Sequence, residues 1–135
     1  MKKIVINKCY GGFGLSHDGT MRYAEIKGIT LYPWLDDITK EVYGARAYIG
    51  NEELCHHYST KPVPESGEYE EGSYFSDRDI QRDDPALVQL VEEMGEAANG
   101  RCANLGVVKI PSGIEFTIEE YDGLEWVAEK HRTWG

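Results

Sequence analysis

Long apolar runs and paired cysteines are both missing from this chain. The apolar stretch that follows two N-terminal lysines is only Ile4-Val5-Ile6, whereas a secretory signal needs roughly 7–15 apolar residues and a membrane span needs ~20. Three widely spaced cysteines, an odd number, argue against a disulfide framework and favour a reducing compartment. We therefore expect a protein of the cytoplasm that has no membrane segment.

Basic residues are scarce. The chain holds 14 Lys and Arg against 24 Asp and Glu, a formal net charge of −10, which disfavours direct binding to a nucleic-acid backbone. Acids gather in residues 65–84, and again in residues 115–125, where there is no base. One interpretation is a solvated surface that aids solubility. The other is a surface that mimics nucleic acid and inhibits a basic protein, which salt would weaken steeply.

No segment has the spacing of a known catalytic or metal centre. Cys55-His56-His57 is a dense cluster of metal-ligating residue types, but adjacent strand residues point to opposite faces, so at most two of them converge. No C-x-x-C or H-x-x-x-H spacing accompanies them. Cys9 with a histidine would make a nucleophile and its base, but a buried thiol is the commoner role. We expect no catalytic residue, metal or cofactor, and a small enzyme stays an alternative.

A glycine-rich loop, Tyr10-Gly11-Gly12-Phe13-Gly14, follows the first apolar strand. Glycines permit positive φ and close backbone approach, so the loop N–H groups could hold an anion at the end of a strand. The loop lacks the Gly-Lys-Ser/Thr ending of a P-loop and the full G-x-G-x-x-G spacing, so a nucleotide hydrolase or a Rossmann fold is excluded. The alternative is a tight strand-to-helix turn that fixes Phe13 in the core.

Arginines elsewhere in the chain are candidate partners for such an anion. Arg78 and Arg82 could aim two guanidinium groups at a phosphate or carboxylate. Arg132 joins them if it points toward the glycine loop. The alternative for Arg78 and Arg82 is an ion-pair network with the neighbouring aspartates, because exposed pairs are common and weak.

Local signals mark two helices. Ser16 is the predicted N-cap of a short helix, although Gly19 weakens its first turn. Met21, Tyr23, Ala24 and Ile26 indicate this helix, and Gly28 suits the position after its end. The clearer helix spans residues 85–98, with Asp84 as N-cap, Pro85 in the first helical position and an apolar stripe at helical spacing. Asn99-Gly100 ends it.

Strands are predicted on both sides of these helices. Ile4-Val5-Ile6 is apolar on both faces, which favours a central strand. Residues 29–32 form a strand that Pro33 ends, and residues 41–49 are β-leaning. Residues 103–110, 114–119 and 126–129 are strands that form a C-terminal meander with one buried face, and Asp122-Gly123 is the hairpin turn.

The order of elements predicts one α+β domain over residues 1–135, with an exposed acidic loop at about 60–76. We expect a mainly antiparallel sheet packed by two helices, a strand–Gly-loop–helix at the N-terminus and a C-terminal β-meander.

Three segments carry a resemblance. Residues 4–16, 82–88 and 120–134 resemble a family of small accessory proteins from tailed bacteriophages and prophages. That family brings no established activity, so no catalytic residue carries over. The resemblance implies a phage product that acts in the cytoplasm of the infected bacterial cell. Accessory phage proteins of this kind often bind a host defence protein or sequester a nucleotide signal between subunits.

The residues and the resemblance together predict a non-enzymatic binding protein, a homo-oligomer, that counters host defence by binding a nucleotide-like anionic ligand or a host protein. An aromatic ring of the loop would stack on a base, and loop amides and an arginine would hold phosphate. The predicted ligand-binding residues are Tyr10, Gly11, Gly12, Phe13, Gly14, Ser16, Arg78, Arg82 and Arg132.

Overall fold

The computed structural model of the chain describes residues 1–37, 44–47, 57–62 and 72–130. These residues divide into two compact units. The first unit combines Met1–Tyr23 with Ile80–Gly135, and the second is Ala24–Asp79. The expectation of one domain over residues 1–135 stays a prediction. Residues 63–71, most of the predicted acidic loop at 60–76, lie outside the described part of the chain.

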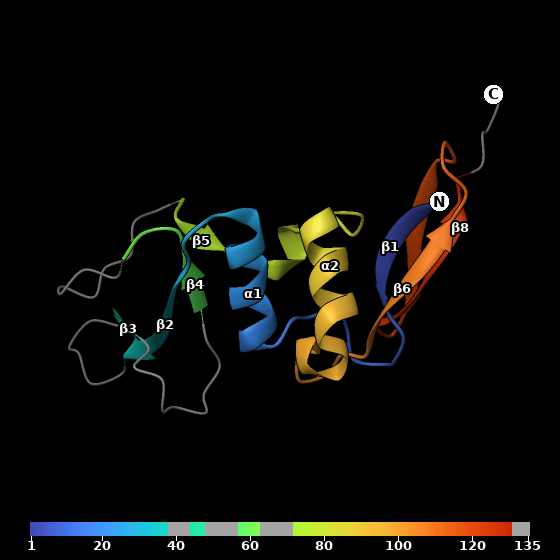
Figure 1. Cartoon of the computed structure of the whole chain (residues 1–135). Helices are drawn as coiled ribbons and strands as arrows, with labels where there is room; N and C mark the ends of the chain where they lie inside the picture. Colours follow the sequence, from blue (N-terminus) through green and yellow to red (C-terminus); the bar gives the residue numbers. More distant parts are fainter. Residues whose placement is uncertain (38–43, 48–56, 63–71, 131–135) are drawn as a thin grey trace, which may run out of the picture. The chain divides into compact units, whose positions relative to one another are not determined.

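The α+β class is confirmed, and the described residues form two α-helices and antiparallel strands (Figure 1). The elements are β1 (Lys2–Asn7), α1 (His17–Lys27), β2 (Tyr32–Asp37), β3 (Gly44–Ala47), β4 (His57–Ser59), β5 (Tyr74–Phe75), the 3₁₀ turn η1 (Asp77–Asp79), α2 (Pro85–Met94), the 3₁₀ turn η2 (Gly95–Ala98), β6 (Leu105–Ile110), β7 (Phe116–Tyr121) and β8 (Leu124–Glu129). Within the described part of the chain, the strands form three antiparallel sheets, with orders β1-β6, β3-β2-β4-β5 and β7-β8.

The first unit buries β1 under α2. Ile4 and Val5 are fully buried, as are Leu87 and Leu90 on the apolar stripe of α2. α2 contacts both β1 and β6, and β8 contacts β1 (Figure 1). The β1–β6 ladder runs from Lys2 opposite Ile110 to Asn7 opposite Leu105.

The predicted second helix is confirmed at its start and shortened at its end. The Asp84 carboxylate accepts a hydrogen bond from the Ala86 N–H at 2.9 Å, and Pro85 occupies the first turn. The α-helix stops at Met94 because Gly95 takes a φ of 58°. η2 then continues to Ala98, which accounts for the predicted span to residue 98.

The strand–Gly-loop–helix unit is also confirmed. Ser16 caps α1, since its Oγ accepts a hydrogen bond from the Gly19 N–H at 3.0 Å. The helix begins at His17, directly after the predicted N-cap, and Gly28 follows its end with a φ of 73°. The Ser16 hydroxyl also donates to the Ala97 carbonyl at 2.6 Å, so the cap joins the helix start to η2.

The predicted strand over residues 29–32 is wrong in position. β2 begins at Tyr32 and contains Pro33, which pairs with Tyr58 of β4. The ladder to β3 starts only at Trp34. Among the described residues, the strand partner of Pro33 is on β4, which is consistent with a proline near the start of a strand.

The described residues of the second unit include β2, β3, β4 and β5. Trp34 is buried, stacks on the His57 ring with centroids 4.4 Å apart and donates its indole N–H to the Ser59 hydroxyl at 2.8 Å. Of the β-leaning residues 41–49, the structure describes 44–47, which form β3. The others in that range lie outside the described residues.

The C-terminal strands pair differently from a continuous meander. β6 pairs with β1, and β7 pairs with β8 in a hairpin. The predicted turn is confirmed, because Asp122 and Gly123 take φ values of 53° and 89°, as a two-residue hairpin turn with both central residues at positive φ requires.

Candidate functional site

The glycine loop is held tightly against two neighbouring turns. Gly11 and Gly12 take φ values of 132° and 133°, and the Gly11 N–H donates to the Asp122 carbonyl at 3.0 Å. A Cβ on Gly11 would lie 2.4 Å from the Cys102 carbonyl oxygen, and one on Gly123 would lie 2.5 Å from the Gly12 nitrogen. These glycines therefore allow backbone to pack on backbone, which is one use of glycine in a loop.

Asn7, fully buried at the end of β1, fixes the start of the loop. Its side-chain amide donates to the carbonyls of Cys9 at 2.8 Å and Gly123 at 2.7 Å, and its Oδ1 accepts from the Asn104 N–H at 2.8 Å. Its own backbone N–H donates to the Glu125 carboxylate at 2.7 Å. One side chain thus joins β1, the loop and the hairpin turn, as buried polar groups require partners.

Arg82 is bound to Glu125 beneath the loop. Its two terminal nitrogens donate to the two carboxylate oxygens at 2.6 and 2.9 Å, a bidentate pair. The Arg82 side chain is 20% exposed and that of Glu125 is 7% exposed. The guanidinium carbon also lies 3.7 Å from the centroid of the Phe13 ring, in cation–π range. The charge of Arg82 is therefore neutralised inside the protein.

The predicted ligand-binding residues come together only in part. Phe13 and Arg82 contact each other through a cation–π interaction, so neither side chain lines an open site. Ser16 is the cap of α1, and Tyr10 is 65% exposed beside the loop. Arg78 lies in η1 of the second unit, and Arg132 lies outside the described residues.

Cys9 lies at the start of the glycine loop, beside Asn7 and Cys102. Its Sγ is 3.4 Å from Asn7 Oδ1 and 3.4 Å from the Cys102 carbonyl oxygen, so the thiol contacts an amide and a carbonyl. In the part of the chain that the structure describes, no group of three or more His, Cys, Asp or Glu side chains is placed to hold a metal ion. Cys55 and His56 of the predicted cluster lie outside that part.

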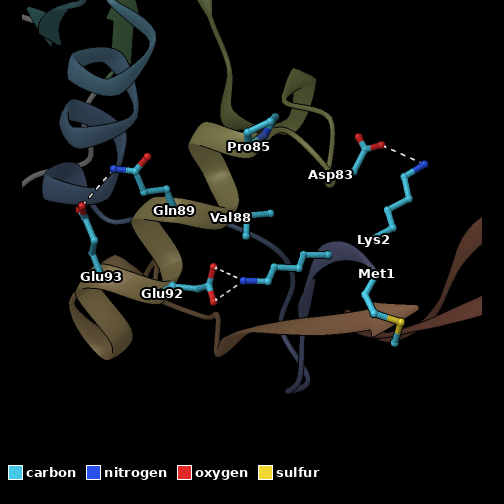
Figure 2. Close-up of a pocket in the computed structure, with 9 residues that line it drawn as sticks. Met1, Lys2, Asp83, Pro85, Val88, Gln89, Glu92 and Glu93 are labelled. Carbon is cyan, nitrogen blue, oxygen red and sulfur yellow. Dashed lines mark hydrogen bonds and ion pairs between the residues drawn. The ribbon is translucent and has the colours of Figure 1, made fainter. Parts of the chain in front are cut away.

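A groove of about 650 Å³ lies between the start of β1 and α2 (Figure 2). Its rim carries ion pairs between Lys2 and Asp83 at 3.3 Å and between Lys3 and Glu92 at 3.0 Å. Hydrogen bonds from Arg22 and then from Gln89 hold the pKa of the Glu93 carboxyl below its usual range. The charges on this rim are therefore paired within the protein, which lowers their attraction for a charged ligand.

The β7–β8 hairpin presents a different kind of surface. Alternation along the strands and the cross-strand register put six side chains on one face, which we call the outer face. Tyr121 on it is 68% exposed and Trp126 is 43% exposed. The outer face consists of Thr117, Glu119, Tyr121, Leu124, Trp126 and Ala128.

The outer face was missed by sequence reasoning, although its signal was present. The alternation of residues 114–119 indicates one buried face, and extending it across Asp122-Gly123 places Trp126 on the opposite one. Glu119 lies on this face, and exposed Glu115 and Asp122 lie just before and just after β7, whereas Glu120 belongs to the opposite face, across from Glu125.

Comparison with known proteins gives no relative: no family model, no curated protein and no solved structure matches the chain. Among the described residues, no helix is both long and apolar enough to cross a membrane.

Proposed function

We propose that this chain is a binding protein whose outer face takes up a basic surface of another protein. The observation that carries the proposal is the exposure of Trp126 and Tyr121 on one hairpin face. Tryptophan and tyrosine are the residue types that most often dominate protein–protein binding energy, because they bury a large area at a small entropic cost.

The charge around the outer face selects the chemistry of the partner. Glu119 lies on the face, exposed Asp122 lies at the turn, and exposed Glu115 precedes β7. Lys130 lies at the end away from the turn, where its backbone N–H donates to the Glu115 carbonyl at 2.9 Å. An acidic rim around an aromatic centre favours a partner of opposite charge, and the net charge of −10 steers such a partner over longer distances.

The rival proposal, a nucleotide-like anion at the glycine loop, has less support from the geometry. Arg82 is already paired with Glu125, and the Gly11 N–H already donates to Asp122. The partner that we propose is a host protein of the infected cell, bound by an acidic surface, as the resemblance to phage accessory proteins implies. Formation of a homo-oligomer stays a prediction.

Binding of a fluorescently labelled lysine homopeptide, followed by anisotropy, tests the proposal. We expect binding that weakens between about 0.1 M and about 1 M salt, as the Debye length falls from ~10 to ~3 Å. At low salt, Trp126→Ala should bind the lysine homopeptide more weakly than the unaltered protein does. Tyr74→Ala removes an equally prominent aromatic ring, 50% exposed, from the second unit and is the matched control. An affinity that is the same in Trp126→Ala and in the unaltered protein would contradict the proposal, as would absence of binding at low salt.

A further inference from the structure

We infer that Trp126 and Glu119 form a recognition site for an arginine side chain of the partner. The inference rests on the proposed function, since it names the group by which a basic partner would be bound. It adds a distinction between arginine and lysine, which net charge alone does not make.

The hairpin register holds the two side chains together. Glu119 lies directly opposite Trp126 on the outer face, and the indole Nε1–H donates to Glu119 Oε2 at 3.1 Å. This bond fixes the carboxylate at the edge of the ring. A carboxylate offers about four acceptor positions on its two oxygens, so the group keeps the capacity to accept from a second donor.

Such a pair suits a guanidinium better than an ammonium. A guanidinium is planar and weakly hydrated, so it can stack on the indole face while its N–H groups donate to an adjacent carboxylate. The lysine ammonium is a compact and strongly hydrated charge, which is attracted to the carboxylate and to the ring face but cannot stack on the ring as a plane. The site should therefore prefer arginine at equal peptide charge.

The protein already uses the same three components in its interior. Arg82 lies with its guanidinium carbon 3.7 Å from the Phe13 ring centroid while it donates two hydrogen bonds to Glu125. The outer face presents an aromatic ring and a carboxylate in contact, with the ring 43% exposed. The arginine would come from the partner and complete the arrangement there.

Tyr121 extends the site along β7. It lies two residues from Glu119 on the same face, diagonal to Trp126, at a spacing that long and aromatic side chains can bridge. The apolar stem of a bound arginine would run across these rings, as the stems of long basic side chains commonly do on apolar surface.

The experiment compares arginine and lysine homopeptides of equal length by anisotropy at about 0.15 M salt. We expect the arginine peptide to bind more tightly, and Trp126→Ala to reduce its affinity about two- to fivefold more than that of the lysine peptide, as the removal of one exposed cation–π contact predicts. Glu119→Gln keeps an acceptor for the indole N–H and should also reduce the preference. Glu96→Gln, at an exposed position of η2, is the matched charge control.

The outcomes separate the two proposals. Equal affinity for both peptides overturns the arginine site and leaves the basic partner supported. An arginine preference that persists unchanged in Trp126→Ala overturns the site as well. If neither peptide binds at low salt, the proposed function fails and the arginine site fails with it. Circular dichroism of each variant establishes that the hairpin is folded, and Trp126→Phe, which keeps a ring, should retain part of the preference.

Discussion

Replacing Glu125 by glutamine tests whether the Arg82–Glu125 pair holds the first unit together. Glutamine keeps the volume and an acceptor for the Asn7 N–H, but it removes the charge that accepts two bonds from Arg82. Breaking one partner of a buried pair costs about 3–5 kcal/mol, because an uncompensated charge is left behind. The 20% exposure of the Arg82 side chain allows some solvation of that charge, so we expect a loss of about 3 kcal/mol in the free energy of unfolding.

Urea unfolding followed by far-ultraviolet circular dichroism measures this loss. The matched control is Glu92→Gln, which breaks the Lys3 pair at a carboxylate side chain that is 45% exposed, and it should cost under about 1 kcal/mol. Adding Arg82→Met to the Glu125→Gln variant should recover most of the loss, since no charge then stays unpaired and the glutamine still accepts from the buried Asn7 N–H. A difference of less than about 1 kcal/mol between the two glutamine variants would refute the reasoning, because the buried pair would then behave as a surface pair.

Three further changes probe the same unit by urea unfolding. Gly123→Ala should lower the free energy of unfolding more than Gly113→Ala does. Both glycines have a φ above 80°, but only a Cβ at Gly123 would lie against backbone, 2.5 Å from the Gly12 nitrogen. Equal losses in the two variants would mean that the close packing of Gly123 on Gly12 does not contribute to stability. Burial, followed by a hydrogen bond to the carboxylate that caps α2, raises the pKa of Tyr23 to about 12. The stability from Tyr23 should therefore be complete below its ordinary pKa of ~10 and be lost as the pH rises through about 12, and Tyr23→Phe should flatten that fall. Glu120 lies opposite Glu125 in the ladder, so Glu120→Gln should stabilise the protein by about 0.2–1 kcal/mol, and a loss of stability would contradict a repulsion between them.

Local signals in the sequence predict the ends of elements well. Asp84 and Pro85 mark the start of α2, Ser16 marks the start of α1, and Asp122-Gly123 marks the hairpin turn. Each of these residues acts through its own backbone or through a neighbour within three positions. The physics is contained in a short stretch of chain, and a single sequence therefore reveals it.

Contacts between distant residues are a different matter. Asn7 and Glu125 are 118 positions apart, and Arg82 and Glu125 are 43 apart. Nothing near any of these residues marks them as partners, so the sequence favours an ion pair of Arg82 with the neighbouring aspartates and does not indicate Glu125. The sequence also leaves the glycine loop open to two interpretations, an anion site and a tight turn. Only the fold brings Gly11 against Cys102 and Gly12 against Gly123. These contacts show that the loop packs on neighbouring backbone.

The Arg82–Glu125 pair lowers the affinity that the glycine loop could have for an anion bound through Arg82. An anion that recruited Arg82 would have to replace both bonds to Glu125 and leave that carboxylate, 7% exposed, without its cation. A cost of about 3–5 kcal/mol would lower the affinity by roughly two to four orders of magnitude. The exposed Trp126 and Tyr121 rings need no such rearrangement to meet a partner. A ligand of modest intrinsic affinity therefore gains more on the outer face than at the loop, which favours a macromolecular partner for this chain.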